Sequence, residues 1–360
     1  MSSQSYEEKY LERNLDDKSK LDVGPSTILD MIQQSITKDI IEEVENVSQD
    51  KTTVERTLDV NDSSELVIGI DLSTSPTTIV LLNLDADVVL VDYLESYIGE
   101  EAIVETFPIA IINFLEKHQI LKDRIKWVSV GLPGEMNKSN TIVTYSYYLQ
   151  ISDLPLKEIL EEKLNVPITL MNDLEAAVYA ESIVKKQRYH TIAYSLVDKG
   201  VGTSFILHNE FYRGANGGAG KMYQLGRYGA ELTYNDLITN YPDLFADLTL
   251  YEALDKYVEL GLNGSHLELR DKLDYMIEHM GEYFASVLQL LDLEKMIIAG
   301  WITRNSQLFK RICSQIQYKE LAVNNPTELE APHWKENGIA VGAAIMGIYH
   351  LTNSDIKRFG

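Results

Sequence analysis

The stretch VPITLMNDLEAAVYAE, from Val166 to Glu181, joins a short apolar run to an alanine-rich segment. Pro167 to Met171 predict a buried strand, and the residues from Leu174 onward predict a helix. Asn172 and Asp173 lie at the junction. A carboxylate at the start of a helix can accept a proton from a substrate hydroxyl, or it can serve as an N-cap for free backbone amides. Taken alone, the stretch favours the N-cap.

The composition is that of an ordinary globular protein. The 360 residues are 45% apolar and 24% charged, which is enough for two or more domains with sizeable cores. The single cysteine, Cys313, excludes a disulfide within the chain and a cysteine-rich zinc site, and we expect a buried, inert thiol. The sequence has neither an apolar run of transmembrane length nor the apolar core of a signal peptide at its start, so we expect a cytoplasmic protein.

The chain is strongly acidic, with a net charge of −23 and a pI of about 4.7. A negative surface repels the phosphates of nucleic acids, so extensive nucleic-acid contact over the whole surface is not expected. A small DNA-reading module remains compatible with this charge. Acidic proteins also bind sugars, nucleotides and other proteins.

The N-terminal region differs from the rest. We expect residues 1–24 to be a charged tail, and residues 25–62 have the spacing of three short amphipathic helices, as in a helix-turn-helix. The residues that would then face a DNA groove are Lys51, Thr52, Thr53 and Arg56. Residues 1–64 hold seven basic and fifteen acidic residues, and such an acidic balance opposes phosphate contact. A small helical cap on the next domain is therefore the alternative.

An internal repeat organises the remainder of the chain. Residues 66–93 show the order strand, polar loop, strand, turn, strand, and residues 191–213 show it again about 125 residues later. Such a repeat predicts two α/β lobes with a ligand cleft between them. We expect the first lobe over residues 65–182, with a C-terminal helix at 338–350 packing back onto it. The second lobe is expected over residues 183–337.

Six segments of the chain resemble the ROK family, in the same order and with similar spacing. They read VIGIDLSTS, VSVGLPGEM, LPLKEILEEKLNVPITLMNDLEAAVYAE, GVGTSFILHNEFYRGANGGAGK, LDLEKMIIAG and GIAVGAAIMGI. This family groups sugar-responsive repressors and sugar kinases on a duplicated fold of the actin/hexokinase (ribonuclease H-like) type. The resemblance covers roughly Leu66 to Leu351. The family's repressors carry a winged helix-turn-helix at the position of residues 25–62.

The resemblance implies roles for individual residues. Asp173 matches the catalytic base of the kinases, which takes a proton from the sugar hydroxyl that attacks the γ-phosphate. The sugar-type ligand would contact Gly134, Tyr148, Asn172, Asp173, Lys221 and Gln224. The nucleotide site, in degenerate form, would comprise Asp71, Ser73, Ser75, Gly200, Gly202, Thr203 and Gly300.

The chain also departs from the family pattern. Ser73, Thr74, Ser75 and Pro76 stand where the first phosphate loop normally has small glycines and a threonine, and side chains there obstruct the approach of backbone to phosphate. The sugar-binding asparagine aligns near Tyr148. A glutamate and a histidine of the family are replaced by Lys221 and Gln224, and Trp301 replaces the second glycine of a late pair. The zinc-binding cysteine cluster is missing, so we expect no zinc and no other metal site.

These departures favour a non-catalytic regulator over an enzyme, because phosphoryl transfer depends on precise positioning. We therefore expect a ROK-type transcriptional regulator-like protein, with a sugar-type ligand between two lobes, possible DNA contact through the N-terminal helices, no membrane association and a homodimeric state. One alternative is an ATP-dependent sugar kinase, which alone would need ATP and magnesium. The other is a degenerate dimeric interaction protein that binds neither DNA nor sugar.

Overall fold

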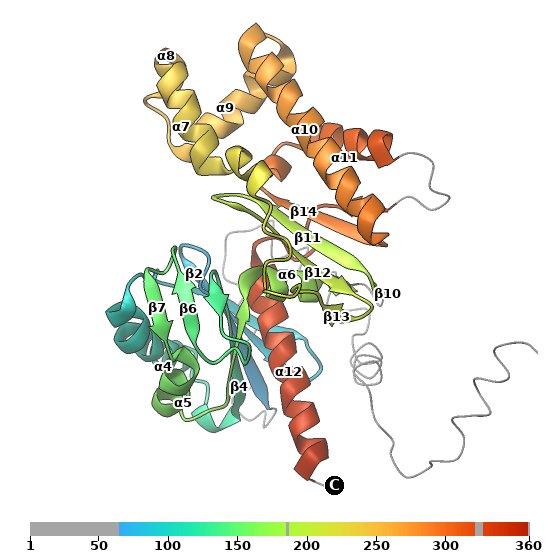
Figure 1. Cartoon of the computed structure of the whole chain (residues 1–360). Helices are drawn as coiled ribbons and strands as arrows, with labels where there is room; N and C mark the ends of the chain where they lie inside the picture. Colours follow the sequence, from blue (N-terminus) through green and yellow to red (C-terminus); the bar gives the residue numbers. More distant parts are fainter. Residues whose placement is uncertain (1–64, 185–186, 321–326, 359–360) are drawn as a thin grey trace, which may run out of the picture.

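The computed structural model describes residues 65–184, 187–320 and 327–358 (Figure 1). The predicted tail, the predicted helices of residues 25–62 and the four predicted DNA-contacting residues lie outside the described residues. The helix-turn-helix thus stays a prediction. Within the described part, two sheets lie on either side of a pair of helices.

The first sheet has five strands in the order β3-β2-β1-β4-β8. Their bounds are β1 Leu66–Asp71, β2 Thr77–Asn83, β3 Val88–Leu94, β4 Ile125–Leu132 and β8 Ile168–Asn172. Strand β1 pairs antiparallel with β2 and parallel with β4, which in turn is parallel to β8. Both faces of this sheet are covered by helices, which explains why β1 is buried along its whole length.

Alternate residues of β1 belong to two different cores. Leu66, Ile68 and Ile70 pack with the helices of one face, α4 (Phe107–Lys117) and α5 (Leu156–Leu164). Helix α4 continues from the single turn η1 (Ala102–Thr106), and the turn η2 (Lys122–Arg124) precedes β4.

Val67 packs on the other face, in the same core as residues of α6 (Asp173–Ser182) and α12 (Gly338–Arg358). A small three-stranded sheet follows β4. It consists of β5 (Glu135–Met136), β6 (Val143–Ser146) and β7 (Ile151–Leu154).

The second sheet repeats the first. Its order is β13-β12-β11-β14-β15, with the same pattern of parallel and antiparallel neighbours. The strands are β11 Ile192–Val197, β12 Val201–Leu207, β13 Glu210–Phe211, β14 Lys295–Gly300 and β15 Glu328–Glu330. The duplicated α/β fold expected from the sequence is thereby confirmed. Val201 and Gly202 belong to β12, and Val201 pairs with Val197 across a tight hairpin.

The second lobe carries the remaining helices (Figure 1). They are α7 Ala230–Asn240, α8 Pro242–Phe245, α9 Leu250–Asn263, α10 Leu267–Leu291 and α11 Ser306–Glu320, with the short turns η3 Tyr223–Tyr228, η4 Trp301–Thr303 and η5 Lys335–Asn337. A short ribbon, β9 (Ile183–Val184) with β10 (Gln187–Arg188), links the lobes. The long helices α10 and α11 pack together over the second sheet. Cys313 on α11 is half-buried, and burial raises the pKa of its thiol to about 11, so the thiol is protonated near neutral pH.

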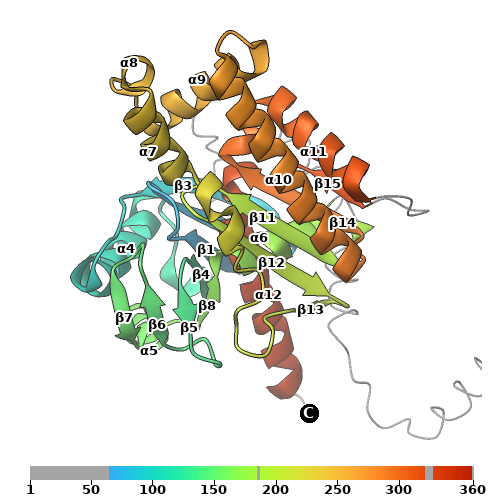
Figure 2. The ribbon, with the colours of Figure 1, turned by 45° about the horizontal axis from the view of Figure 1, so that its top comes forward.

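Helices α6 and α12 lie between the two sheets (Figures 1 and 2). One core contains Val67 of the first sheet, Ile192 of the second, and Ala177 and Ala340 of the two helices. A Cβ at Gly342 of α12 would lie 1.9 Å from the carbonyl oxygen of Ala176, so only glycine permits this approach. Alanines and glycines in both helices therefore hold the two lobes close together.

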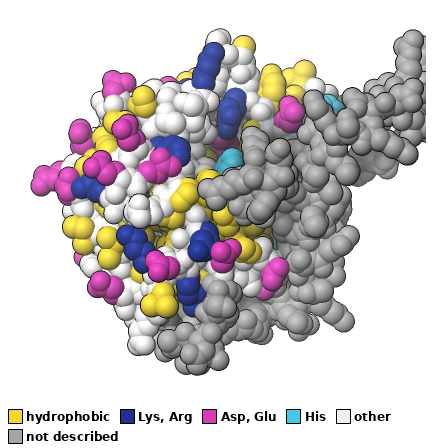
Figure 3. All heavy atoms as spheres, turned by 90° about the horizontal axis from the view of Figure 1, so that it is seen from below, with side chains coloured by type: hydrophobic (Ala, Val, Ile, Leu, Met, Phe, Trp, Pro, Cys, Tyr) yellow, Lys and Arg dark blue, Asp and Glu magenta, His cyan; other side chains and the backbone are white. Residues whose placement is uncertain are grey.

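Acidic and basic side chains are interspersed on the face of the molecule seen from below (Figure 3). The coloured part of that face shows no large field of one sign. Within residues 65–184, 187–320 and 327–358, no helix combines the length and the apolar character that a membrane crossing requires.

Candidate functional site

The candidate site lies where the carboxyl ends of the parallel strands meet at the lobe junction. In the register of the first sheet, Asp71 lies opposite Gly131, and Leu132 lies opposite Asn172. Strands β1, β4 and β8 therefore end at one edge, which is where open α/β sheets bind ligands. In the second sheet, Val197 lies opposite Gly300 at the corresponding edge. The two lobes thus present equivalent edges.

Asn172, rather than Asp173, is the N-cap of α6. Its Oδ1 accepts hydrogen bonds from the backbone N–H groups of Leu174 (3.0 Å) and Glu175 (3.3 Å). The interpretation of Asp173 as the cap was wrong, because the strand continues to Asn172 and Asp173 already has the first helical position. Asn172 Nδ2 points to the carbonyl oxygen of Gly134 at 3.4 Å, which joins two of the predicted ligand residues. Most of the hydrogen-bonding capacity of Asn172 is therefore used within the protein.

Two buried carboxyl groups flank this point. Asp71 has no exposed surface and Asp173 is 9% exposed. Burial raises the pKa of Asp71 to about 7, and the neighbouring charge of Asp173 adds to the rise. Burial likewise raises the pKa of Asp173 to about 6, against the lowering effect of the Leu174 backbone N–H that donates to it at 2.9 Å. A carboxylate with a pKa near 6 can exchange protons at neutral pH, as a general base must.

The first predicted phosphate loop turns its donors inward. The backbone N–H and the hydroxyl of Ser73 both donate to Asp71 Oδ1, at 2.7 and 2.6 Å, and the Thr74 hydroxyl approaches Oδ2 at 3.4 Å. The hydroxyl of the exposed Ser75 pairs with that of Ser96 at 2.6 Å. The Ser73 donors satisfy a buried carboxyl group and the Ser75 hydroxyl is paired with Ser96, so these groups are not free to bind a phosphate.

The second predicted phosphate loop shows a similar loss. The Thr203 hydroxyl is buried against Ser195 (2.6 Å) and the Met222 sulfur (3.1 Å), and its backbone N–H donates to the Gly220 carbonyl (2.9 Å). The alternation of β12 could have shown this orientation, because Thr203 and the buried Phe205 share one face of the strand. The loop lacks these two donors for phosphate binding.

Glycines shape the same loop. At Gly202 a Cβ would lie 2.8 Å from the Leu174 side chain, so glycine lets the second lobe approach the start of α6. Gly200 faces open space, and its carbonyl accepts from the Asp198 N–H at 2.9 Å. Gly300 has φ +98°, and a Cβ there would lie 2.0 Å from the Val197 carbonyl oxygen. The glycines at 202 and 300 are thus required by packing and by backbone conformation, independently of any ligand.

Three cations of the second lobe contact the first lobe around this site. Lys221, on the loop before η3, forms an ion pair with Glu135 of β5, which raises the pKa of Lys221. Lys199 lies 4.6 Å from the centre of the Tyr148 ring.

The third of these inter-lobe cations, Arg213, follows β13. It binds Glu175 of α6 with two hydrogen bonds of 2.5 and 2.9 Å. Lys221 and Tyr148 are among the predicted ligand residues, whereas Arg213, Glu175, Glu135 and Lys199 were not predicted. No local pattern indicates these partners, because each pair joins residues distant in sequence.

The remaining predicted residues are separate. Gln224 is exposed on η3, and no described hydrogen bond or ion pair joins it to the other predicted ligand residues. Trp301 is 2% exposed and donates to the Tyr228 carbonyl at 2.9 Å within the core of the second lobe. The described residues contain no group of three or more histidine, cysteine or acidic side chains able to hold a metal ion.

The fold and these strand ends define a duplicated two-lobe protein of the kind shared by sugar kinases and their repressor relatives. Residues 67–224 match the model of the ROK family.

Among curated relatives, the xylose repressor of Caldicellulosiruptor bescii is 28% identical over 168 residues, which is 46% of this chain and 42% of that protein. The DNA-binding transcriptional repressor Mlc of Escherichia coli is 23% identical over 260 residues, 66% of this chain and 64% of that protein. The chain thus spans less than half the length of the xylose repressors that it matches.

Solved structures show the same fold. A ROK hexokinase from Thermus thermophilus superposes with a TM-score of 0.65 at 17% identity, covering 80% of this chain and 99% of that one. A ROK family transcriptional regulator, a homologue of E. coli Mlc, superposes with a TM-score of 0.62 at 17% identity, covering 80% and 81%. Kinases and regulators therefore share this architecture.

Proposed function

We propose that the protein is a ROK-type transcriptional regulator without kinase activity, with a sugar-type ligand site between its lobes. The observation that carries the proposal is the state of the two phosphate loops. The donors of Ser73 bind Asp71. The Thr203 hydroxyl is hydrogen-bonded with Ser195 and Met222, and its backbone N–H donates to the Gly220 carbonyl. A nucleotide would have to compete with bonds that the protein already makes, so the loops fit phosphate poorly.

The relatives support a sugar-type ligand and a DNA target. They include xylose repressors and N-acetylglucosamine repressors. In our proposal a sugar hydroxyl binds Asp173 and the free capacity of Asn172, near Gly134. The ion pair between Lys221 and Glu135, and the contact of Lys199 with Tyr148, then adjust as the ligand enters.

The proposed output is through the N-terminal residues. Residues 25–62 would read DNA through Lys51, Thr52, Thr53 and Arg56, in a cytoplasmic homodimer. Ligand binding between the lobes would change the position of these helices, which is a coupling between two sites. In this proposal the ligand lies between the two lobes predicted from the sequence, at residues 65–182 and 183–337.

The test is a gel shift of the full chain on the DNA that precedes its own reading frame. We expect a shift at low salt that a panel of pentoses, hexoses and N-acetylated hexosamines modulates. The variant Arg56→Met should abolish the shift, whereas the control Arg227→Met, an exposed residue of the second lobe, should retain it. Absence of any shift at low salt would contradict the DNA-binding part of the proposal.

A sugar kinase is the second candidate, and one observation favours it: the pKa of Asp173, raised to about 6, suits a general base. ATP turnover over a panel of hexoses decides between the two. Turnover that Asp173→Asn abolishes would establish a kinase and overturn our proposal. We expect no turnover above that of the variant.

A dimeric interaction protein is the third candidate. It is favoured by the inter-lobe contacts of Lys221, Arg213 and Lys199, which already occupy polar groups around the site. A stable dimer by light scattering, together with the absence of both DNA and sugar binding, would support this candidate against the regulator.

A further inference from the structure

The small sheet of β5, β6 and β7 exposes a tyrosine beside the candidate site. In the register of β5 and β6, Tyr145 lies opposite Glu135, and directly opposed residues of an antiparallel pair have their side chains on the same face. Tyr145 is 53% exposed, and the Glu135 side chain is 59% exposed. The two side chains therefore lie together on an open face of this sheet.

This face is one residue away from the proposed sugar site. The carbonyl oxygen of Gly134, the residue before Glu135, lies 3.4 Å from Asn172 Nδ2. Gly134 also packs on the strand that carries Tyr145, since a Cβ at position 134 would lie 2.6 Å from the Tyr145 carbonyl oxygen. A ligand that reaches Asn172 and Asp173 can therefore extend over Glu135 and Tyr145.

The second lobe completes this surface. Lys221 forms an ion pair with Glu135, and that hydrogen bond raises the pKa of Lys221, with a smaller contribution from the nearby Tyr223. Tyr223 is 82% exposed. An exposed tyrosine of each lobe thus lies beside an ion pair that joins the lobes. We call Glu135, Tyr145, Lys221 and Tyr223 the tyrosine platform.

The tyrosine platform has the chemistry of a carbohydrate surface. The C–H face of a sugar ring packs on an aromatic ring, and tyrosine offers a rigid apolar face with a polar tip. At the edge of the sugar, hydroxyl groups can donate to Glu135 and accept from Lys221. Among the described residues, no hydrogen bond, ion pair or ring contact involves the Tyr145 side chain, whereas the Tyr148 ring already has Lys199 at 4.6 Å. The Tyr145 ring can therefore receive a sugar.

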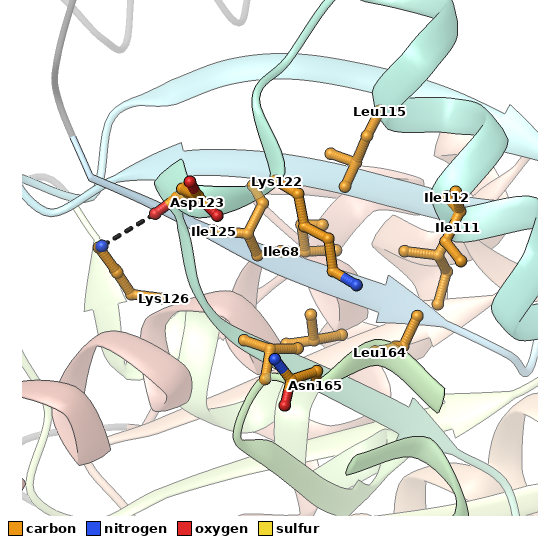
Figure 4. A pocket seen from close by; sticks show the side chains of 12 residues that line it. Ile68, Ile111, Ile112, Leu115, Lys122, Asp123, Ile125, Lys126, Leu164 and Asn165 are labelled. Carbon is orange, nitrogen blue, oxygen red and sulfur yellow. Dashed lines mark hydrogen bonds between the residues drawn. The ribbon is translucent and has the colours of Figure 1, made fainter. Parts of the chain in front are cut away.

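The hollow at the other end of the first sheet offers no comparable surface (Figure 4). Its aliphatic lining residues include Ile68, Ile125 and Leu164, which are 0–8% exposed within the core of the lobe. Lys126 at its rim donates to the Asp123 carbonyl oxygen at 2.9 Å. The accessible aromatic surface lies at the lobe junction instead.

We propose that the tyrosine platform binds the second ring of a disaccharide whose first ring occupies the site at Asn172 and Asp173. This inference rests on the sugar site of the proposed function. One face of the second ring packs on Tyr145, and its hydroxyl groups bind Glu135 and Lys221. A monosaccharide held at Asp173 would leave this surface uncovered, so the geometry favours the longer ligand.

Titration calorimetry of the full chain compares xylose, glucose and N-acetylglucosamine with their β-1,4-linked disaccharides, xylobiose, cellobiose and N,N′-diacetylchitobiose. We expect one disaccharide to bind about tenfold more tightly than its monosaccharide, because a ring packed on an aromatic side chain contributes about as much as an aromatic pair. Tyr145→Ala should reduce the ratio of the two affinities to about one, whereas Tyr145→Phe, which keeps the ring, should retain it. The control Tyr318→Ala, at a 72% exposed residue of α11, should also retain it. Thermal melting of each variant checks that it is folded.

The outcomes separate the platform from the sugar site. Equal affinities within every pair in the parent protein, or a ratio that Tyr145→Ala leaves intact, would overturn the platform and leave the sugar site standing. Asp173→Asn should weaken the binding of both sugars of a pair. Disaccharide binding that depends on Tyr145 and not on Asp173 would support the platform and overturn the proposed sugar site. Absence of binding of all these sugars at millimolar concentration would overturn both.

Discussion

The two copies of the lobe each carry an aspartate at or just after the end of the first strand of the repeat, and they satisfy it in different ways. Asp71 ends β1, and Asp198 directly follows β11. Asp71 is fully buried and accepts hydrogen bonds from the loop that follows it, through Ser73. Asp198 is half-buried and accepts a hydrogen bond from the Tyr251 hydroxyl of α9 at 3.0 Å.

The different donors to Asp71 and Asp198 show that the two copies of a repeated fold can diverge at their turns. In the first lobe, the turn itself supplies the donors, so its side chains point inward. In the second lobe, a distant helix supplies the side-chain donor, together with the backbone N–H of Lys199 in the turn. Burial raises the pKa of both aspartates, but the rise is large only for Asp71, to about 7.

The glycines opposite the two turns should give the largest contrast. Gly131 lies opposite Asp71, and Gly300 lies opposite Val197. Gly300→Ala should lower the free energy of unfolding by about 4 kcal/mol, because it combines a strained φ of +98° with a contact to a backbone carbonyl. Gly131→Ala should cost about half of that or less, since its Cβ would meet a side-chain methyl group of Ile339. Urea unfolding of both variants measures the difference, and equal costs would contradict the structural distinction.

The next effect concerns the charge of Asp71. Its pKa is raised in the folded protein, so folding favours the protonated form, and stability is lost as pH rises from about 4 to about 7. Asp71→Asn keeps an acceptor for Ser73 and removes the ionisation. It should leave stability at pH 4 unchanged and raise it above pH 7, by on the order of 3 kcal/mol. Asp198→Asn, the matched change in the second lobe, should give a smaller gain. Urea unfolding at several pH values measures the stability of both variants. If the stability of the parent protein and that of Asp71→Asn changed with pH in the same way, the buried carboxyl group of Asp71 would not be the cause of the loss.

A smaller effect should follow from removing the donors. Tyr251→Phe deletes the hydrogen bond to Asp198 and should cost about 1–2 kcal/mol at pH 8, since it removes the side-chain donor of a partly buried carboxylate. Ser73→Ala deletes only the hydroxyl donor to Asp71, because the backbone N–H of residue 73 remains, and should cost about half as much. Thermal melting of the two variants compares them. A larger cost for Ser73→Ala would show that the loop hydroxyl contributes more than the distant tyrosine.

The smallest effect is expected at the surface of the second turn. Lys199→Met removes the cation over the Tyr148 ring and should cost about 0.5 kcal/mol, as exposed cation–π contacts do. Lys310→Met is the matched control, with no expected change. If Lys199→Met costs no more than the control in urea unfolding, the contact does not contribute to the stability of the closed lobes.

Much of the fold could be predicted from the sequence, because strand patterns are local. The apolar runs of β1 and β2 and the polar turns beside β2 and β12 indicate strands within a few residues, and their repetition indicates two lobes. The last strand residue, Asn172, was harder to predict, since an asparagine at a strand end also suits a turn. This error led to the wrong cap.

The site could be predicted only in part. Asp173 was indicated by its position at a strand end, and Asp71 and Asn172 by the resemblance to the ROK family. The bonds that occupy the site could not be, because Arg213 and Glu175 are 38 positions apart and Lys221 and Glu135 are 86 positions apart. Such pairs depend on how the two lobes pack against each other, and no period or spacing in the sequence indicates that arrangement.

The close packing of α12 has a consequence for the synthesis of the protein. This helix covers β1 and β4. It packs so closely on Gly69 of β1 that a Cβ at position 69 would lie 2.0 Å from the Ala340 carbonyl oxygen. The ribosome makes α12 after every other described element, roughly 270 residues after β1. Translation proceeds at about 5–20 residues per second, so one face of the first sheet stays exposed for roughly 15–50 seconds before α12 has been made. The nascent first lobe should therefore be a client of chaperones until translation of α12 is finished.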